Sequence, residues 1–342
     1  MRQNEMGNIR TDRFQMALKE KSGLLLVLLI LMLIFGFLTK GRFWEIANLI
    51  NLLRAISLST IVAFGMTLCI ITGGIDLSVG ALMAVSSTYC AGLIEHNAPT
   101  LVAVLAGILM AFAMGTVNGF LISRTPIPPF IATLSMMTAA RGVAYMYSGG
   151  RPIRTPTGFG AVGNGYLFDI IPYPVIIALV IMIIMSILLN RTKFGRSIFA
   201  LGGSREAAVF SGIDIKKTLW STYALTGFLC GISGVIWASR TYSGQPTLGT
   251  GAEMDAIAAA VVGGTSMAGG VGSILGTFIG ALIIQVLNSG LNYLNVPFYY
   301  NNILRGVVIA GAVLFDMHRK SGRGSVTAWF KSLKRGGDSA DK

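Results

Sequence analysis

Residues 256–304 read AIAAAVVGGTSMAGGVGSILGTFIGALIIQVLNSGLNYLNVPFYYNNIL. This stretch of 49 residues contains no Asp, Glu, Lys or Arg. About 20 apolar residues are enough for one helix to cross the roughly 30 Å hydrocarbon core of a bilayer. The stretch is too long for two helices alone, so it predicts three membrane crossings with uncharged loops, near 252–265, 272–288 and 302–316.

Apolar runs continue on the N-terminal side of this stretch. Hydrophobic residues make up 53% of the 342 residues and charged residues only 12%, about half the charged share of a typical soluble protein. Seven further runs predict seven more crossings: 24–38, 55–72, 77–94, 101–122, 128–147, 170–189 and 218–239. The predicted fold class is all-α, a polytopic membrane helix bundle of about ten helices over residues 24–316, with no soluble domain.

The basic residues predict the orientation of the bundle. The net charge is +13, yet segments 1–23, 190–217 and 317–342 hold five, six and seven of the 27 Lys and Arg residues. Cytoplasmic segments of membrane proteins carry an excess of Lys and Arg, so we expect both tails and the 190–217 loop in the cytoplasm. Ten crossings that start inside place all three on one side. This confinement also argues against nucleic-acid binding. Three basic residues do not follow this rule, because the ten-crossing topology places them on the outer side: Lys40, Arg42 and Arg54.

No sequence motif indicates covalent chemistry. Cys69, Cys90 and Cys230 each lie inside an apolar run, which predicts small buried residues and neither a disulfide nor a metal cluster. The two histidines lie in different polar segments, and no GxxxxGK[ST], GxSxG or HExxH motif occurs. We therefore expect a chain that is not an enzyme, binds no metal or cofactor and has no ATP-hydrolysing site of its own.

The 190–217 loop reads NRTKFGRSIFALGGSREAAVFSGIDIKK. Residues 201–203 (Leu-Gly-Gly) predict a break, Ser204 is a suitable N-cap, and Gly212 ends a short helix over about 205–211. So short a helix is unstable alone in water, so we expect it to dock on a partner subunit. The alternative is a helix that lies on the bilayer surface, held by its basic flanks.

Glycine clusters and polar residues suggest a transport pathway. A helix from Gly251 to Gly264 covers only about 20 Å, which would leave its terminal glycines within the membrane, and short glycine-interrupted spans often mark such a pathway. The candidate residues are Gly73, Gly74, Asp76, Asn118, Thr133, Gly263, Gly264, Gln285 and Asn288. The alternatives are tight surface turns for the glycines, a helix N-cap for Asp76 and helix packing for the others. We expect the spans to lack charge, which is consistent with a neutral polar substrate.

Long stretches of the chain resemble the permease subunit of bacterial ATP-binding-cassette importers for monosaccharides, and the ribose-type member most closely. These stretches are ITGGIDLSVGALMAV (71–85), PPFIATLSMMTAARGVAY (128–145), RTKFGRSIFALGGSREAAVFSGIDIKK (191–217), QPTLGTGAEMDAIAAAVVGGTSMAGGVGSILGTFIGALI (245–283) and RGVVIAGAVLFD (305–316). They agree with that family in order and spacing over most of residues 55–316.

The resemblance implies a fold like that of the ten-helix vitamin B12 importers, in the bacterial inner membrane. It implies a second permease copy, identical or related, together with cytoplasmic ATPase subunits that bind ATP and a periplasmic sugar-binding protein. The residues implied to form the coupling helix that contacts the ATPase are Ser204, Arg205, Glu206, Ala207, Ala208 and Gly212. The competing hypothesis is a secondary transporter or facilitator for a small neutral solute, which would need no docking helix.

Overall fold

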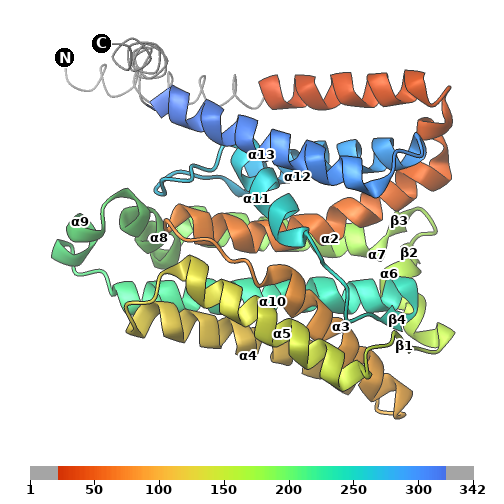
Figure 1. Ribbon diagram of the computed structural model, residues 1–342, viewed down its shortest axis with the longest axis horizontal. Helices are drawn as coiled ribbons and strands as arrows, with labels where there is room; N and C mark the ends of the chain where they lie inside the picture. Colours follow the sequence, from red (N-terminus) through yellow and green to blue (C-terminus); the bar gives the residue numbers. More distant parts are fainter. Residues whose placement is uncertain (1–21, 321–342) are drawn as a thin grey trace, which may run out of the picture.

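The computed structural model describes residues 22–320, and its long helices run roughly parallel through one elongated bundle (Figure 1). The helices are Ser22–Leu38, α2 (Ile46–Ile71), α3 (Val79–Glu95), α4 (Thr100–Arg124), α5 (Pro129–Ser148), α7 (Tyr173–Arg191), α10 (Ile215–Thr241), α11 (Ala252–Val262), α12 (Ile274–Tyr293) and α13 (Phe298–Lys320). Each of the ten predicted apolar runs coincides with one of these helices. The prediction of a membrane helix bundle is therefore confirmed.

The helices differ in how well they could span a membrane. By length and composition, five of the described helices qualify: α2, α4, α7, α10 and α12. Ser22–Leu38 and α3 are apolar but shorter, and α11 has only 11 residues. The number of crossings therefore stays a prediction.

Short elements complete the described part of the chain. They are η1 (Arg42–Trp44), η2 (Thr157–Gly160), α6 (Ala161–Asn164), α8 (Lys193–Gly203), α9 (Arg205–Phe210), and the strands β1 (Ile153–Arg154), β2 (Tyr166–Leu167), β3 (Ile171–Pro172) and β4 (Ser243–Gly244). Strand β1 pairs antiparallel with β4, and β2 with β3.

The connecting segments gather at two ends of the bundle. Helices α8 and α9 lie at one end, while α6 and the four strands lie at the other (Figure 1). The loops that follow α2 and α4 lie at the α9 end, where residues 72–74 and 125–129 line one cavity with Arg205. This grouping matches the predicted alternation of crossings. Which end faces the cytoplasm stays a prediction, and the predicted tails 1–23 and 317–342 lie almost entirely outside the described residues.

Helix α2 lies at the centre of the bundle. From residue 56 to residue 71 every side chain except that of Ser59 is buried, and the helix packs against α7, α10, α11 and α12. A helix that is apolar on all sides must be buried or face lipid, and α2 is covered by its neighbours. The cysteines Cys69, Cys90 and Cys230 are free and buried, as predicted.

Candidate functional site

Residues 243–251, which we call the 243–251 segment, enter the bundle as the short strand β4 followed by a series of turns before α11 begins. Gly244 lies against Ser87 and Thr88 of α3, and Gly249 lies against the backbone of Gly80 near the start of the same helix. The segment therefore follows α3 for about 12 Å, the length of eight helical residues. Gly249 adopts a φ of 72°, a conformation that side-chain-bearing residues rarely take. This crossing is broken: a short strand and a series of turns are followed by a helix of 11 residues.

Arg141 of α5 satisfies part of the backbone of the 243–251 segment. Its guanidinium donates hydrogen bonds to the carbonyl oxygens of Pro246 (2.6 Å) and Leu248 (2.7 Å). Irregular backbone at membrane depth is tolerated only where protein groups or enclosed water satisfy its polar atoms. Our expectation that the spans lack charge was therefore wrong at Arg141, which lies inside the predicted run 128–147.

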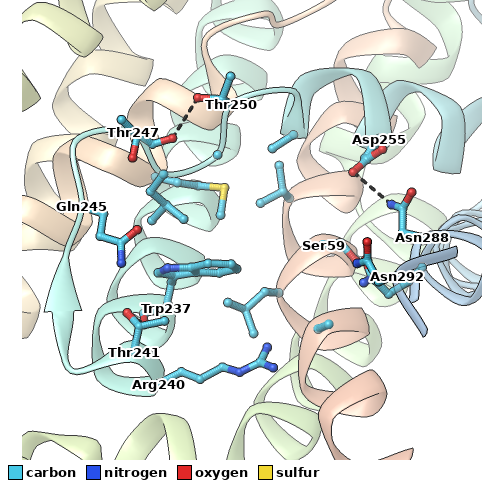
Figure 2. Close-up of a pocket in the computed structure, with 18 residues that line it drawn as sticks. Ser59, Trp237, Arg240, Thr241, Gln245, Thr247, Thr250, Asp255, Asn288 and Asn292 are labelled. Carbon is cyan, nitrogen blue, oxygen red and sulfur yellow. Dashed lines mark hydrogen bonds between the residues drawn. The ribbon is translucent and has the colours of Figure 1, made fainter. Parts of the chain in front are cut away.

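A cavity of about 640 Å³ lies between this segment, α2, α10, α11 and α12 (Figure 2). Its volume is within the range of small-molecule sites. The indole of Trp237 extends across the middle, with Gln245 and Thr241 on one side and Asp255 and Asn288 on the other (Figure 2). Its polar lining residues are Ser59, Arg240, Thr241, Gln245, Thr247, Thr250, Asp255, Gln285, Asn288 and Asn292. This mixture of amides, hydroxyls, one indole and two charged side chains, set among apolar residues, can bind a small polar molecule.

Two of the nine predicted pathway residues line this cavity. Gln285 and Asn288 are three positions apart on α12, so they share one helical face. The Asn288 amide donates a 3.4 Å hydrogen bond to the Asp255 carboxylate across the cavity wall (Figure 2).

Asp76, Asn118 and Thr133 lie elsewhere, around the connection between α2 and α3. Asp76 Oδ1 accepts hydrogen bonds from the backbone N–H of Ser78 (2.9 Å) and from its hydroxyl (2.6 Å). The Asn118 amide donates to the Ser78 hydroxyl (2.9 Å), and the Thr133 hydroxyl donates to the Ile75 carbonyl (3.3 Å). The N-cap of α3 is Ser78, so Asp76 stabilises the turn before the helix instead of occupying the cap position itself.

The four candidate glycines also lie outside the lining of the large cavity. Gly73 and Gly74 line a second cavity of about 310 Å³ at the α9 end, together with Arg205. Gly263 lies against the backbone of Gly276 on α12, and Gly264 has a φ of 90° in the turn that ends α11. A role of these glycines in a pathway stays a prediction.

The predicted short helix is present as α9, over Arg205–Phe210. The Ser204 hydroxyl accepts a hydrogen bond from the backbone N–H of Ala207 (3.2 Å), which confirms the predicted N-cap. Gly212 follows with a φ of 72°. The predicted break at 201–203 was wrong, because α8 continues to Gly203. Helix α9 is therefore not isolated, since α8 leads directly into it.

Helix α8 rests directly on two crossings of the bundle. A Cβ on Gly202 would overlap the carbonyl oxygen of Ile71, at the end of α2, and the backbone nitrogen of Gly270, in the loop after α11. These two groups also bond to each other, because the Gly270 N–H donates to the Ile71 carbonyl (2.9 Å). The three backbones therefore meet at a single point, which we call the Gly202 contact.

Helix α9 presents apolar side chains that no described residue covers. Ala208 is buried, but Val209 is 56% exposed and Phe210 is 91% exposed. Glu206 and Ala207 are also exposed. Exposed apolar residues beside charged ones are typical of a surface that binds another protein or a membrane.

Known proteins are similar to most of this chain. The family described as branched-chain amino acid transport system / permease component matches residues 48–313. The ribose import permease protein RbsC of Bacillus subtilis (strain 168) is 43% identical over 305 residues, which are 88% of this chain and 94% of that protein. RbsC of Escherichia coli (strain K12) is 44% identical over 297 residues, 85% of this chain and 92% of that protein.

A more distant relative is named for a different sugar. The L-arabinose ABC transporter permease protein AraH of Azospirillum brasilense is 34% identical over 304 residues, 89% of each chain. No solved structure matches the chain.

Proposed function

Because this chain belongs to the family of branched-chain amino acid transport system permease components, we propose that it is the membrane-spanning permease subunit of an ATP-binding-cassette importer for ribose or a related monosaccharide. It is a multi-pass protein of the inner membrane. The observation that carries the proposal is the 43–44% identity with ribose import permeases over most of both chains.

The polar part of the large cavity suits a sugar, and the choice of a sugar over a branched-chain amino acid follows the ribose import permeases named above. Gln245, Gln285 and Asn288 can each donate and accept hydrogen bonds, as the hydroxyl groups of a sugar require. The lining also includes the apolar side chains of Leu58, Val62 and Met83, which would suit an aliphatic group. We therefore place substrate passage in this cavity, and competition between ribose and leucine for uptake tests the choice.

A separate ATPase drives transport in this proposal. The chain has no P-loop, and α9 presents the exposed Phe210 and Val209 as a docking surface. Movement of α9 on ATP binding reaches the bundle through α8 and the Gly202 contact. That contact touches the end of α2 and the loop after α11, and both helices line the cavity. The cavity then opens alternately to the two sides of the membrane.

The remaining parts of the proposal follow the family resemblance. The bundle crosses the membrane ten times, as in vitamin B12 importers, with residues 1–23, 190–217 and 317–342 in the cytoplasm. A second permease copy completes the pore, and a periplasmic binding protein delivers the sugar. The chain itself binds no cofactor, and ATP is bound by the partner subunit.

The docking of α9 is tested by a matched pair of exposed phenylalanines. Phe210 is 91% exposed on α9, and Phe168 is 84% exposed at the opposite end of the bundle. We expect Phe210→Ser to abolish co-purification of the ATPase and ATP-dependent ribose uptake, and Phe168→Ser to leave ATPase association intact. Normal ATPase association of Phe210→Ser would contradict the proposed docking.

The predicted orientation is tested by cysteine labelling. All three native cysteines are buried, so they give little background. Ser211→Cys, beside α9, should react with a membrane-impermeant maleimide only from the cytoplasm, and Ile170→Cys, which is exposed at the other end, only from the periplasm. Labelling of both from the same side would contradict the topology.

A further inference from the structure

A third cavity, of about 420 Å³, lies between the end of α4 and the start of α10, apart from the large cavity and from α9. Its lining combines positive charge with aromatic rings. The lining residues are Phe120, Ser123, Arg124, Asp214, Lys216, Lys217 and Trp220. Three of these seven are basic and one is acidic, so the cavity carries a net positive charge.

A close approach of the two helices shapes this cavity. Gly119 of α4 lies against the backbone of Trp220, where a Cβ would meet the Trp220 carbonyl oxygen. The neighbouring side chains Phe120 (55% exposed) and Trp220 (40% exposed) remain accessible on the outer face of the bundle. Trp is enriched at the boundary between hydrocarbon and water, so this groove opens to lipid at that boundary.

The positive charges are available for a ligand. Asp214 is already engaged as the N-cap of α10, because its Oδ1 accepts the backbone N–H of Lys217 (2.9 Å). Within residues 22–320, no hydrogen bond or ion pair engages the side chains of Arg124, Lys216 and Lys217. The N-terminus of α10 adds a partial positive charge.

We propose that this cavity binds the headgroup of an anionic phospholipid. The phosphate would lie among Arg124, Lys216 and Lys217, and the acyl chains would run along the outer face beside Phe120 and Trp220. Basic pockets between membrane helices on the cytoplasmic side suit such headgroups. The open lipid-facing side and the exposed aromatic rings favour a lipid over an acidic segment of a partner protein, which would have no use for an opening into hydrocarbon.

The bound lipid would link α4 to α10 at the end of the bundle that carries α9. Helix α10 begins only five residues after α9 ends, so the headgroup would sit beside the segment that moves during coupling. Loss of the lipid would therefore lower the rate of ATP-driven uptake while the large cavity itself stays unchanged.

Native mass spectrometry of the purified full-length chain with added cardiolipin tests the site. The test variant is Arg124→Gln/Lys216→Gln/Lys217→Gln, and the control is Arg191→Gln/Lys193→Gln/Arg196→Gln, which removes the same charge at the same end of the bundle. A basic residue near an anionic membrane surface contributes roughly fivefold to binding, so we expect roughly a hundredfold weaker cardiolipin binding in the test variant only.

Three outcomes of that titration would overturn the proposal. They are equal weakening in both triple variants, equal binding of neutral phosphatidylcholine by the unaltered chain, and displacement of cardiolipin by millimolar inorganic phosphate. The last result would show a site for free phosphate. Loss of ATPase co-purification in the test variant with unchanged cardiolipin binding would identify the patch as a protein-docking surface instead.

Fluorescence quenching gives a second measurement that does not depend on these variants. The emission of Trp220 is the difference between the fluorescence of the unaltered chain and that of Trp220→Phe. Brominated phosphatidylglycerol, present as a small fraction of a phosphatidylcholine vesicle, should quench this emission more than random contact with lipid predicts. Brominated phosphatidylcholine at the same fraction should give no excess. Equal quenching by the two lipids would contradict a selective site.

Discussion

Helix α2 and residues 243–262 cross the same bundle side by side, but they satisfy their backbones in different ways. Helix α2 is continuous over 26 residues, and its peptide groups bond to one another. Residues 243–262 begin as a short strand followed by turns and end as an 11-residue helix, so part of their backbone depends on Arg141 of another helix. Both line the large cavity. One wall is therefore a continuous helix, whereas the other depends on a side chain of α5 to satisfy its backbone.

The largest effect is expected where both crossings meet α8, at the Gly202 contact. Gly202→Val would force a side chain into the backbone of Ile71 and Gly270. Overpacking usually costs about 1–3 kcal/mol, and backbone neighbours cannot rotate away, so we expect the high end of that range and loss of uptake. Thermal unfolding of the purified chain and uptake assays measure both effects.

The neighbouring glycine supplies the control for this substitution. Gly203 has nothing within 4 Å of a Cβ and lies in the same helix, so Gly203→Ala should be neutral or stabilising by about 0.5–1 kcal/mol. Equal destabilisation by Gly202→Val and Gly203→Ala would show that the Gly202 contact has no special role.

Arg141→Gln should disturb the broken crossing and leave α2 unaffected. Two carbonyl oxygens lose a charged donor, and an unsatisfied buried polar group costs about 1–3 kcal/mol. We expect the 243–251 segment to become more mobile, so that Thr250→Cys reacts faster with maleimide. We also expect uptake to fall at least tenfold, which corresponds to roughly 1.4 kcal/mol or more. Arg151→Gln, on an exposed loop, should change neither. An unchanged labelling rate would contradict the support role of Arg141.

Gly249→Ala should have a smaller effect on the same segment. The substitution forces Ala into a φ of 72° and against the backbone of Gly80. Gly264→Ala meets a similar φ of 90° but no neighbour within 4 Å. The left-handed conformation costs about 1–2 kcal/mol in both, so the excess loss of stability in Gly249→Ala measures the close approach to α3. No excess would mean that the segment does not need this contact.

The smallest effect is expected from the cavity side chains themselves. Gln285→Ala removes one group that could bond to a sugar hydroxyl, worth about 0.5–1.5 kcal/mol. Uptake should therefore show up to roughly a tenfold rise in KM with little change in ATPase association. Ser59, whose hydroxyl donates to the Ile56 carbonyl (3.1 Å), is the control, and Ser59→Ala should leave KM nearly unchanged. A larger rise in KM for Ser59→Ala than for Gln285→Ala would contradict our assignment of Gln285 as a substrate-binding residue.

Sequence patterns predicted the elements whose cause is local. Apolar runs of sufficient length marked the helices, and the cap of α9 was predicted from Ser204 and Gly212 because capping depends only on adjacent residues. The predicted break at 201–203 failed because packing of Gly202 against Ile71 and Gly270 is a tertiary effect, and glycines that break isolated helices are tolerated where helices pack closely.

The hydrogen bonds from Arg141 to the 243–251 segment were not predicted, because the two parts of the chain are distant in sequence. Arg141 and Leu248 are 107 positions apart, and no local pattern links them. The charge of Arg141 inside the apolar run 128–147 was the available signal, since a charge in a span usually has a partner or a function. The cavity was predicted only in part. Gln285 and Asn288 stand out as polar residues in an apolar helix, but Trp237, Gln245 and Thr250 come together only when the 243–251 segment folds along α3.

The central claim is that this chain forms the transport pathway and depends on a separate ATPase to drive transport. Ribose uptake into vesicles tests this claim most directly. Vesicles with this chain alone are compared with vesicles that also contain the ATPase and the sugar-binding protein, with and without ATP. We predict concentrative uptake only in the complete, ATP-supplied vesicles, and its loss with Phe210→Ser. Ribose uptake by the chain alone at the rate of the complete system would contradict the claim.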